Sequence, residues 1–181
     1  MQIILDHNGF VEKIGQLTKL IVSKYPDFNE LVFIGIQQGG VTLADEIVAG
    51  LPQKDNAHEI QYGQLDITFY RDDIRKEILV PDIMNLPFSI ENKNVVLIDD
   101  VLFTGRTIKA ALDVLLDYGR PAKVALCVLI DRREHRQFPI QADYVGMVLS
   151  TNKTDKVKLV KDENGKKHVV LISENDFTQS R

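Results

Sequence analysis

Two adjacent aspartates, Asp99 and Asp100, close an apolar run and precede a Thr-Gly-Arg-Thr loop, all within residues 95–107 (VVLIDDVLFTGRT). Adjacent carboxylates repel each other unless a divalent cation or hydrogen-bond donors, such as sugar hydroxyls, lie beside them. The loop is typical of a turn into a helix N-terminus, where free backbone amides and the helix dipole favour an anion. This one segment therefore offers a diol site and a phosphate site about one ribose apart, as a ribose 5-phosphate requires.

Both features also have an ordinary structural interpretation. An acidic pair can simply end a strand, and a Thr-Gly pair can form a turn before a capped helix. Taken alone, the acidic pair favours that interpretation. The combination of a buried strand, an acidic pair and the loop in one run favours the ligand site instead.

The elements that must position these residues follow from the alternation of apolar runs with helical patterns, which is typical of βαβ units and a mainly parallel sheet. Apolar or alternating runs predict strands at residues 31–36, 64–70, 94–100, 123–131 and 144–149. Helical spacing predicts helices at 10–23, 41–50 and 107–119, and Asn164-Gly165 predicts a hairpin turn within 157–172.

Each of two predicted helices has a set of apolar residues that we expect to face the core. In the first helix these residues are Val11, Ile14, Leu17, Leu20 and Ile21. In the helix after the acidic pair they are Ile108, Ala111, Leu112, Leu115 and Leu116. Such stripes are what a helix lying on a sheet requires.

In an open parallel sheet, ligands bind at the carboxyl ends of the strands. Residues 37–40, 99–107 and 131–136 lie at such ends and carry unusual residues. The segment 71–94 has no regular pattern, and long irregular segments in a compact domain tend to be lids or binding loops. These segments are the candidate parts of one site.

Composition restricts the class of protein. The chain has 181 residues and is 44% hydrophobic and 27% charged, which suits one folded domain over residues 1–181 and excludes disordered and fibrous classes. A formal charge of −4 excludes coating of nucleic acid by bulk positive charge. The single cysteine, Cys127, excludes a disulfide framework. With no apolar run of about 18 residues, we expect a cytoplasmic protein without membrane contact.

Residues 95–107 resemble the phosphoribosyl-pyrophosphate (PRPP) binding motif of type I phosphoribosyltransferases. Residues 66–73 (DITFYRDD), 118–132 (YGRPAKVALCVLIDR) and 129–146 (LIDRREHRQFPIQADYVG) narrow the resemblance to the PyrR family of pyrimidine-operon regulators and uracil phosphoribosyltransferases. The matching blocks extend over about residues 3 to 160. The resemblance implies the type I α/β fold, a central mainly parallel sheet flanked by helices, with a small hood or lid and a β-hairpin.

The resemblance also implies a reaction in which uracil and PRPP give UMP and pyrophosphate, with Mg²⁺ reaching the site through the substrate and Asp99 or Asp100 as its candidate protein ligand. The implied catalytic residues are Asp99, Asp100 and Arg71. The implied PRPP site consists of Asp99, Asp100, Val101, Leu102, Phe103, Thr104, Gly105, Arg106 and Thr107, of which the last four hold the 5-phosphate.

Three further segments receive roles from the resemblance. The pyrophosphate loop is Gln37, Gln38, Gly39 and Gly40. The lid begins at Tyr70, Arg71, Asp72 and Asp73, and Arg71 is the natural partner for pyrophosphate charge. The backbone around Ile130, Asp131 and Arg132 faces the uracil.

The chain departs from the family pattern in two places. Where the family usually has G-I-x-T-R-G, residues 35–40 read GIQQGG, so Gln38 replaces a threonine and Gly39 an arginine. The loss of a charge-assisted contact predicts weaker pyrophosphate binding or turnover. Gln141 and Met147 stand where the family tends to place basic residues, which leaves His135 and Arg136 as candidate RNA contacts on a depleted surface.

Three functions therefore stay open at the level of sequence. The first is uracil phosphoribosyl transfer, and the second is an RNA-binding attenuation regulator or UMP sensor with weak catalysis. The third is a phosphoribosyltransferase for a purine base. The resemblance also implies a homo-oligomer, a dimer or larger.

Overall fold

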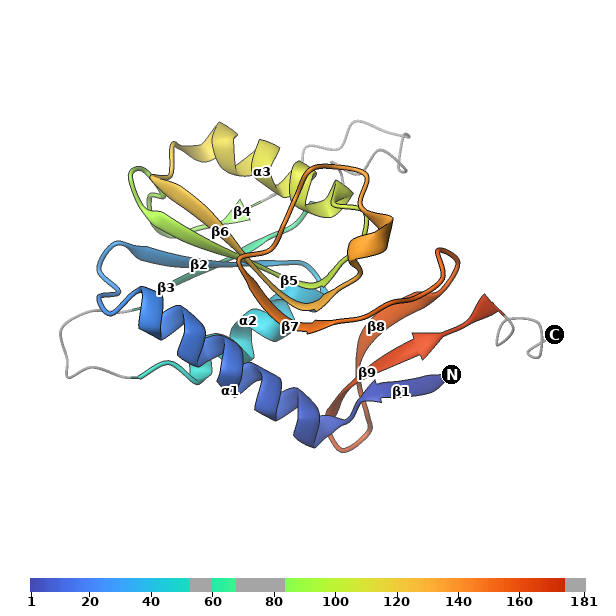
Figure 1. Ribbon diagram of the computed structural model, residues 1–181. Coiled ribbons are helices and arrows are strands. Elements are labelled where there is room, and N and C mark those ends of the chain that lie inside the picture. Colours follow the sequence, from blue (N-terminus) through green and yellow to red (C-terminus); the bar gives the residue numbers. More distant parts are fainter. Residues whose placement is uncertain (53–59, 68–83, 175–181) are drawn as a thin grey trace.

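The computed structural model describes residues 1–52, 60–67 and 84–174, and shows a central sheet with helices on both faces beside a smaller second sheet (Figure 1). The central sheet comprises β2 (Leu31–Ile36), β3 (Gln61–Leu65), β4 (Met84–Asn85), β5 (Asn94–Leu102), β6 (Lys123–Asp131) and β7 (Tyr144–Val148). The second sheet comprises β1 (Gln2–Leu5), β8 (Lys156–Lys161) and β9 (Lys167–Ile172). The helices are α1 (His7–Lys24), α2 (Gly39–Ala49), α3 (Arg106–Tyr118) and the 3₁₀ helix η2 (Arg133–His135).

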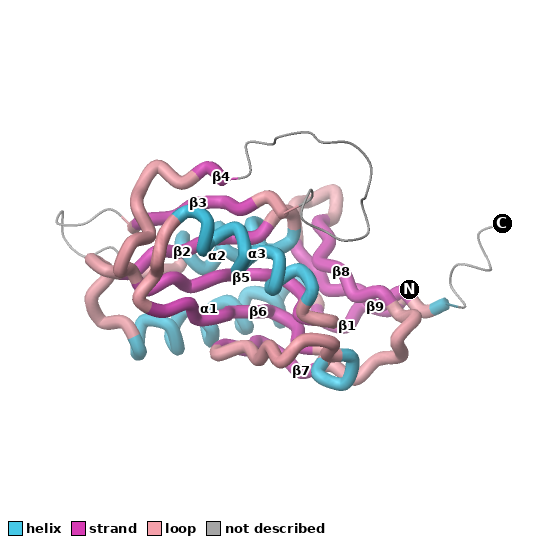
Figure 2. Tube along the Cα trace, turned by 90° about the horizontal axis from the view of Figure 1, so that it is seen from above, coloured by secondary structure: helices cyan, strands magenta, loops and turns pink. Residues whose placement is uncertain are grey.

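The central sheet has the strand order β4-β3-β2-β5-β6-β7, and all of its pairings are parallel except that of β4 with β3. From β2 the chain passes through α2 to β3, and from β5 it passes through α3 to β6, on the opposite side in the strand order. Figure 2 looks onto the sheet with α3 in front of it, while α1 and α2 lie behind. The chain therefore diverges between β2 and β5, which is a topological switch point.

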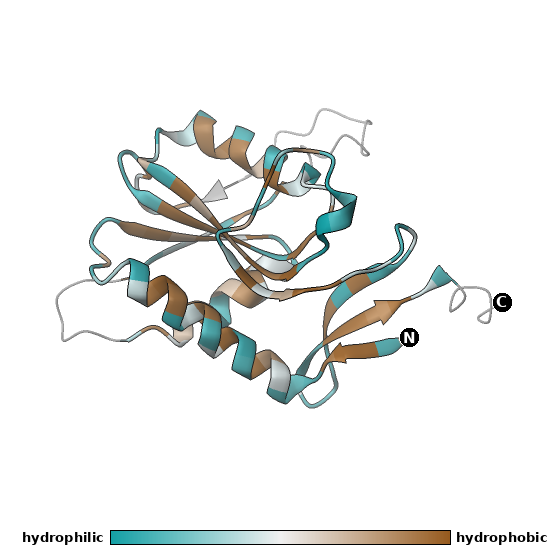
Figure 3. Cartoon of the chain, in the orientation of Figure 1, coloured by the Kyte–Doolittle hydropathy of each residue, from teal (hydrophilic) through white to brown (hydrophobic). Residues whose placement is uncertain are grey.

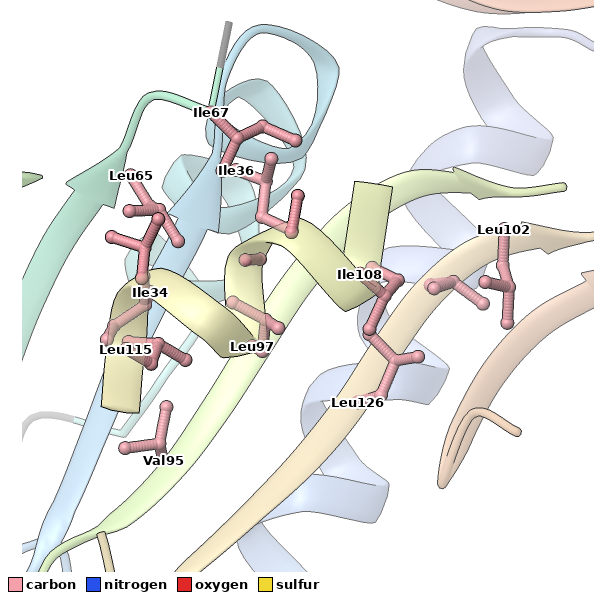
Figure 4. Close-up of a cluster of buried hydrophobic side chains, with 14 of the residues drawn as sticks. Ile34, Ile36, Leu65, Ile67, Val95, Leu97, Leu102, Ile108, Leu115 and Leu126 are labelled. Atoms are coloured by element: carbon pink, nitrogen blue, oxygen red, sulfur yellow. The ribbon is translucent and has the colours of Figure 1, made fainter. Parts of the chain in front are cut away.

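Strands that are buried on both faces separate two hydrophobic clusters, as the hydrophobic strands in Figure 3 indicate. Val95 and Leu97 of β5 pack with residues of α3, in the cluster drawn in Figure 4. Val96 and Ile98 belong instead to the cluster that includes α1 and α2. This alternation is the period of two expected for a strand covered on both sides.

Most predicted elements are confirmed, with shifted ends. β5 continues two residues past the predicted end at Asp100, because it pairs with β6 as far as Leu102. β3 starts and ends earlier than predicted, and residues 68–70 of that prediction lie outside the described residues. The predicted hairpin is β8 and β9, with Gly165 at φ +79° in its turn. β1, which pairs with β9, was not predicted.

The predicted helix faces were partly wrong. Val11, Leu20 and Leu116 are 52%, 50% and 63% exposed, respectively. Their buried chain neighbours, including Phe10, Ile21 and Leu115, occupy the core positions instead. Because successive helix residues are turned by about 100°, the second residue of an adjacent apolar pair can lie beyond the edge of the buried face and turn toward solvent. Within the described residues, no helix is long and apolar enough to cross a membrane.

The adjacent leucines of α3 allow a matched test of the core. Leu115 is fully buried and Leu116 is largely exposed. We expect Leu115→Ala to lower the free energy of unfolding by about 2–5 kcal/mol, because it leaves a cavity. Leu116→Ala should change it by about 0.5 kcal/mol or less. Urea denaturation measures both values, and equal losses would contradict the observed orientation of α3.

Candidate functional site

The site lies where the pairing of β5 with β2 ends. That pairing runs as far as Gly35 opposite Ile98, whereas β6 pairs with β5 as far as Asp131 opposite Leu102. Beyond Ile98, β5 therefore has one edge paired with β6 and one edge not paired with β2. The start of α2 approaches this second edge, since Gly40 lies against the backbone of Ile98 and Asp99. The acidic pair thus lies inside a strand, along its open edge, rather than at the predicted strand end.

Two adjoining hollows, each of about 210 Å³, lie along this edge. The first is lined by Asp99, Val101–Ala110, Asp113 and Phe138. The second is lined by Gln37, Gln38, Gly39, Ile67, Asp99, Asp100, Val101 and Thr107. Asp99, Val101 and Thr107 line both, so the hollows meet at these three residues and suit one elongated ligand.

The first hollow contains the N-terminus of α3. The helix begins at Arg106, after Gly105, which has a φ of +89° that residues with side chains rarely adopt. The Thr104 hydroxyl accepts a long hydrogen bond of 3.4 Å from the Arg106 amide. The first turn carries no acidic side chain that would compete for its amides. Free amides at the positive end of a helix form an anion site.

The connection between β6 and β7 holds this loop from behind. The Thr104 carbonyl accepts hydrogen bonds from the Gln137 amide at 2.9 Å and the Phe138 amide at 3.3 Å. The Arg106 Nε donates to the Gln137 side chain at 2.9 Å. Contacts from this connection therefore set the position of the phosphate loop.

A buried ion-pair cluster connects the same parts. Asp131, at the end of β6, has a side chain that is only 2% exposed. Its two oxygens accept hydrogen bonds from Arg136 and, at 2.9 Å, from Arg133. The Arg136 guanidinium also donates to the carbonyl of Phe103. Arg136 thus ties β6 directly to the start of the phosphate loop.

The residues predicted to face the base are mostly buried, and their polar groups form hydrogen bonds within the protein. Ile130 is fully buried, and Arg132 is 3% exposed. The Arg132 guanidinium lies 3.9 Å from the centre of the Phe103 ring and donates to Thr151 at 2.7 Å. The Arg132 amide donates to Leu102, and the Asp131 carbonyl accepts from Leu149. The base-side role of residues 130–132 stays a prediction.

The two candidate RNA contacts also have internal partners. The His135 Nε2 lies 2.8 Å from the Thr151 carbonyl, and the ring packs edge-on against Phe103. The Arg136 side chain is 15% exposed and is held by Asp131 and Phe103. Their predicted contact with RNA stays a prediction that these geometries do not favour.

The second hollow is acidic. Among the described residues that line it, Asp99 and Asp100 are the charged side chains. Burial raises the pKa of the Asp100 carboxyl, and hydrogen bonds with Asp99 and with the backbone of Leu159 in β8 oppose that rise. The Asp100 amide donates to Asp99 Oδ1 at 3.0 Å. An anion entering this hollow would therefore need a cation beside it.

The structure thus brings residues 37–39 and 99–107 together, while Gly40 packs behind them. The lid residues Tyr70, Arg71, Asp72 and Asp73 lie outside the described residues. Sequence reasoning missed six of the described residues in the lining, and also Leu159 beside Asp100. The six are Ile67, Ile108, Lys109, Ala110, Asp113 and Phe138. The helix predicted at 107–119 could have pointed to Lys109, but no local signal marks Phe138 or Leu159.

The ion-pair cluster leads to a stability prediction. Arg136→Ala should lower the free energy of unfolding by about 3 kcal/mol, because it takes a partner from the buried Asp131 carboxylate. Arg133→Ala is the matched control, since the Arg133 side chain is 60% exposed and should cost about 1 kcal/mol or less. Urea denaturation compares them, and a larger loss for Arg133→Ala would contradict the assignment.

The raised pKa of Asp100 predicts a dependence of stability on pH. Between the ordinary aspartate pKa and the raised value, the folded protein keeps a proton here that the unfolded chain releases. The stability from this group is therefore complete below that range and is lost as pH rises through it. The unfolding free energy of the wild type relative to Asp100→Asn should fall with rising pH in the acidic range. Urea titrations at several pH values measure this difference, and a constant value would contradict the pKa shift.

Solved structures with a similar fold include hypoxanthine phosphoribosyltransferases. A hypoxanthine phosphoribosyltransferase from Staphylococcus aureus superposes with a TM-score of 0.71 at 20% identity, covering 97% of this chain and 94% of that one. A hypoxanthine phosphoribosyltransferase from Trypanosoma cruzi gives a TM-score of 0.69 at 19% identity, covering 98% and 97%. At this identity the likeness shows the fold alone, and it confirms the predicted type I architecture.

Sequence comparisons are more specific. A family model described as "Phosphoribosyl transferase domain" matches residues 1–161. A "Bifunctional protein PyrR" from a Geobacter species is 42% identical over 172 residues, covering 94% of this chain and 96% of that protein. A protein of the same description from Ligilactobacillus salivarius is 45% identical over 173 residues, covering 93% and 96%. With the site geometry, these matches show that the chain belongs to the PyrR family of phosphoribosyltransferases.

Proposed function

We propose that the protein transfers the phosphoribosyl group of PRPP to uracil and forms UMP and pyrophosphate. The observation that carries this proposal is the pair of hollows that meet at Asp99, with a helix N-terminus in the first hollow. PRPP has a phosphate at one end, a diol in the middle and a pyrophosphate at the other end. The helix N-terminus, the acidic pair and the second hollow follow one another in the same order. Uracil is the base that the resemblance to the PyrR family implies.

Each part of the site has a role in binding. The backbone amides of residues 104–107 and the Thr104 hydroxyl hold the 5-phosphate. The carboxylates of Asp99 and Asp100 accept hydrogen bonds from the ribose hydroxyls. Backbone amides in residues 37–39 hold the pyrophosphate, without the arginine that the family usually places at position 39.

In the reaction, a bond forms between N1 of uracil and C1 of the ribose. The bond from C1 to the pyrophosphate oxygen breaks, and its electron pair leaves with the pyrophosphate, while the N1 proton passes to solvent. Positive charge develops on the ribose ring as the leaving group departs. Carboxylates placed beside the ring stabilise that charge. The role of Arg71 toward the leaving group rests on the family resemblance.

The residues present fit a magnesium ion that arrives with the substrate. Among the described residues, no group of three or more His, Cys, Asp or Glu side chains could hold a metal ion alone. Mg²⁺ is commonly bound through one or two carboxylates together with substrate phosphates. Asp99 or Asp100 would therefore hold it, and it would neutralise the charge of the departing pyrophosphate.

Two observations separate this proposal from its alternatives. The purine enzymes among the solved structures are about 20% identical to this chain, so they do not favour a purine base. The internal partners of His135 and Arg136 do not favour RNA binding through these side chains. A homo-oligomer stays a prediction from the resemblance.

A base panel tests the proposed function. With PRPP and Mg²⁺, uracil should release pyrophosphate and yield UMP, while hypoxanthine, guanine and orotate should not. Removal of Mg²⁺ with a chelator should abolish turnover. Transfer to a purine alone, or no transfer to any base beside an active control enzyme, would overturn the proposal.

Substitution of Asp100 tests its role. Asp100→Asn should lower kcat/KM for PRPP by about tenfold to a hundredfold, because a charged acceptor is lost. Asp117→Asn, on the exposed end of α3, is the matched control and should leave the rate unchanged. Circular dichroism and thermal denaturation verify that both variants fold, and an unchanged rate in Asp100→Asn would contradict the assignment.

A further inference from the structure

The start of α2 comes so close to β5 at Gly39 that a side chain there would clash with the Asp100 carboxyl where it lies. A Cβ atom built on Gly39 would lie 2.2 Å from Cγ and Oδ2 of Asp100 and 2.6 Å from Oδ1. Real Cβ contacts are essentially never shorter than 3.0 Å. These three nearest atoms all belong to one carboxyl group. The Asp100 carboxyl therefore occupies the space that a side chain at position 39 would need.

Gly40, the next residue, also has no room for a side chain, but for a different reason. Its Cβ atom would lie 2.4 Å from the carbonyl oxygen of Ile98 and 3.0 Å from Cα of Asp99. These are backbone atoms of β5, which cannot move without disturbing the sheet. Gly40 therefore lets α2 pack on β5, whereas Gly39 meets a side chain that can rotate.

Asp100 has contacts on its other sides. Its amide donates to Asp99 Oδ1 at 3.0 Å, and its carboxyl has a hydrogen bond with the backbone of Leu159 in β8. Both Gly39 and Asp100 line the second hollow. A side chain at position 39 would therefore push the carboxyl away from the backbone of Leu159 and change its place in the hollow.

We propose that Gly39 is a positioning residue for Asp100, and that its lack of a side chain sets where the Asp100 carboxyl lies toward PRPP. In the sequence, Gly39 stands out only because the family usually has a positively charged arginine at this position. In the structure, the absence of a side chain at position 39 also leaves the space that the Asp100 carboxyl fills. Gly39 and Asp100 therefore act as one unit. The importance of this placement for turnover rests on the proposed function.

A double-mutant cycle tests the coupling. Gly39→Ala in the wild type should lower kcat/KM for PRPP by at least about tenfold, because a small displacement of a substrate-binding group is costly. In an Asp100→Ala background, the same substitution should change the remaining rate by about twofold or less, since the atoms that it meets are gone. Equal effects of Gly39→Ala in both backgrounds would overturn the proposal.

Two other glycines provide controls. Gly40→Ala meets backbone atoms, so its effect should persist when Asp100 is alanine. Gly15→Ala, with nothing within 4 Å of its added Cβ, should leave the rate unchanged and slightly raise the stability, because alanine favours the interior of α1 more than glycine does. Relief of Gly40→Ala by Asp100→Ala would indicate a general loosening of the site and would overturn a specific role for Gly39.

Binding and folding measurements separate this inference from the proposed function. Calorimetry with ribose 5-phosphate should show weaker binding for Gly39→Ala in the wild type and no further weakening in the Asp100→Ala background, whether or not uracil is a substrate. If Gly39→Ala alone fails to fold, the double variant should fold again. A double variant that also fails to fold, while Asp100→Ala alone folds, would overturn the proposal. Absence of UMP formation by the wild type would count against the proposed function alone.

Discussion

The place along β5 where strand pairing stops determines the rest of the site. β2 pairs with β5 as far as Ile98, and β6 pairs with it as far as Leu102. The last part of β5 is therefore held along one edge and open along the other, and the chain leaves β2 and β5 in opposite directions. At such a switch point a ligand reaches strand ends that no further strand covers. Asp99 and Asp100 lie in this part of β5, where Asp99 lines both hollows and Asp100 lines the second.

The end of β5 that pairs with β6 leads into the phosphate loop. Polar groups that do not bind the ligand hold this part of the structure in place. Asp131 and Arg136 connect the end of β6 to the carbonyl of Phe103, and Thr104 accepts hydrogen bonds from the following connection. A buried carboxylate is tolerated because two guanidinium groups satisfy it. The second sheet contributes as well, through the backbone of Leu159. The loop that offers anion-binding amides is thus fixed in place before a ligand arrives.

Local patterns predicted most elements of the central sheet because periodicity reports which residues a strand or helix buries. They missed β4, whose two residues lie in a segment without a regular pattern. They failed where two apolar residues are adjacent in a helix, as at Leu115 and Leu116, since only packing selects the buried member. They also failed for β1, a short strand whose partner, β9, lies near the other end of the chain. The apolar pattern of so short a segment reports burial at most, and it carries no information about such a distant partner.

By itself, the sequence determined the family, the order of the main strands and helices without β1 and β4, and a segment that joins an acidic pair to a phosphate loop, because all of these are local patterns. Only the tertiary structure decided which polar residues at the strand ends face the hollows. It turned Arg132, His135 and Arg136 inward and placed Gly39 against Asp100. Contacts between segments that are distant along the chain leave no periodic trace, so packing alone sets them.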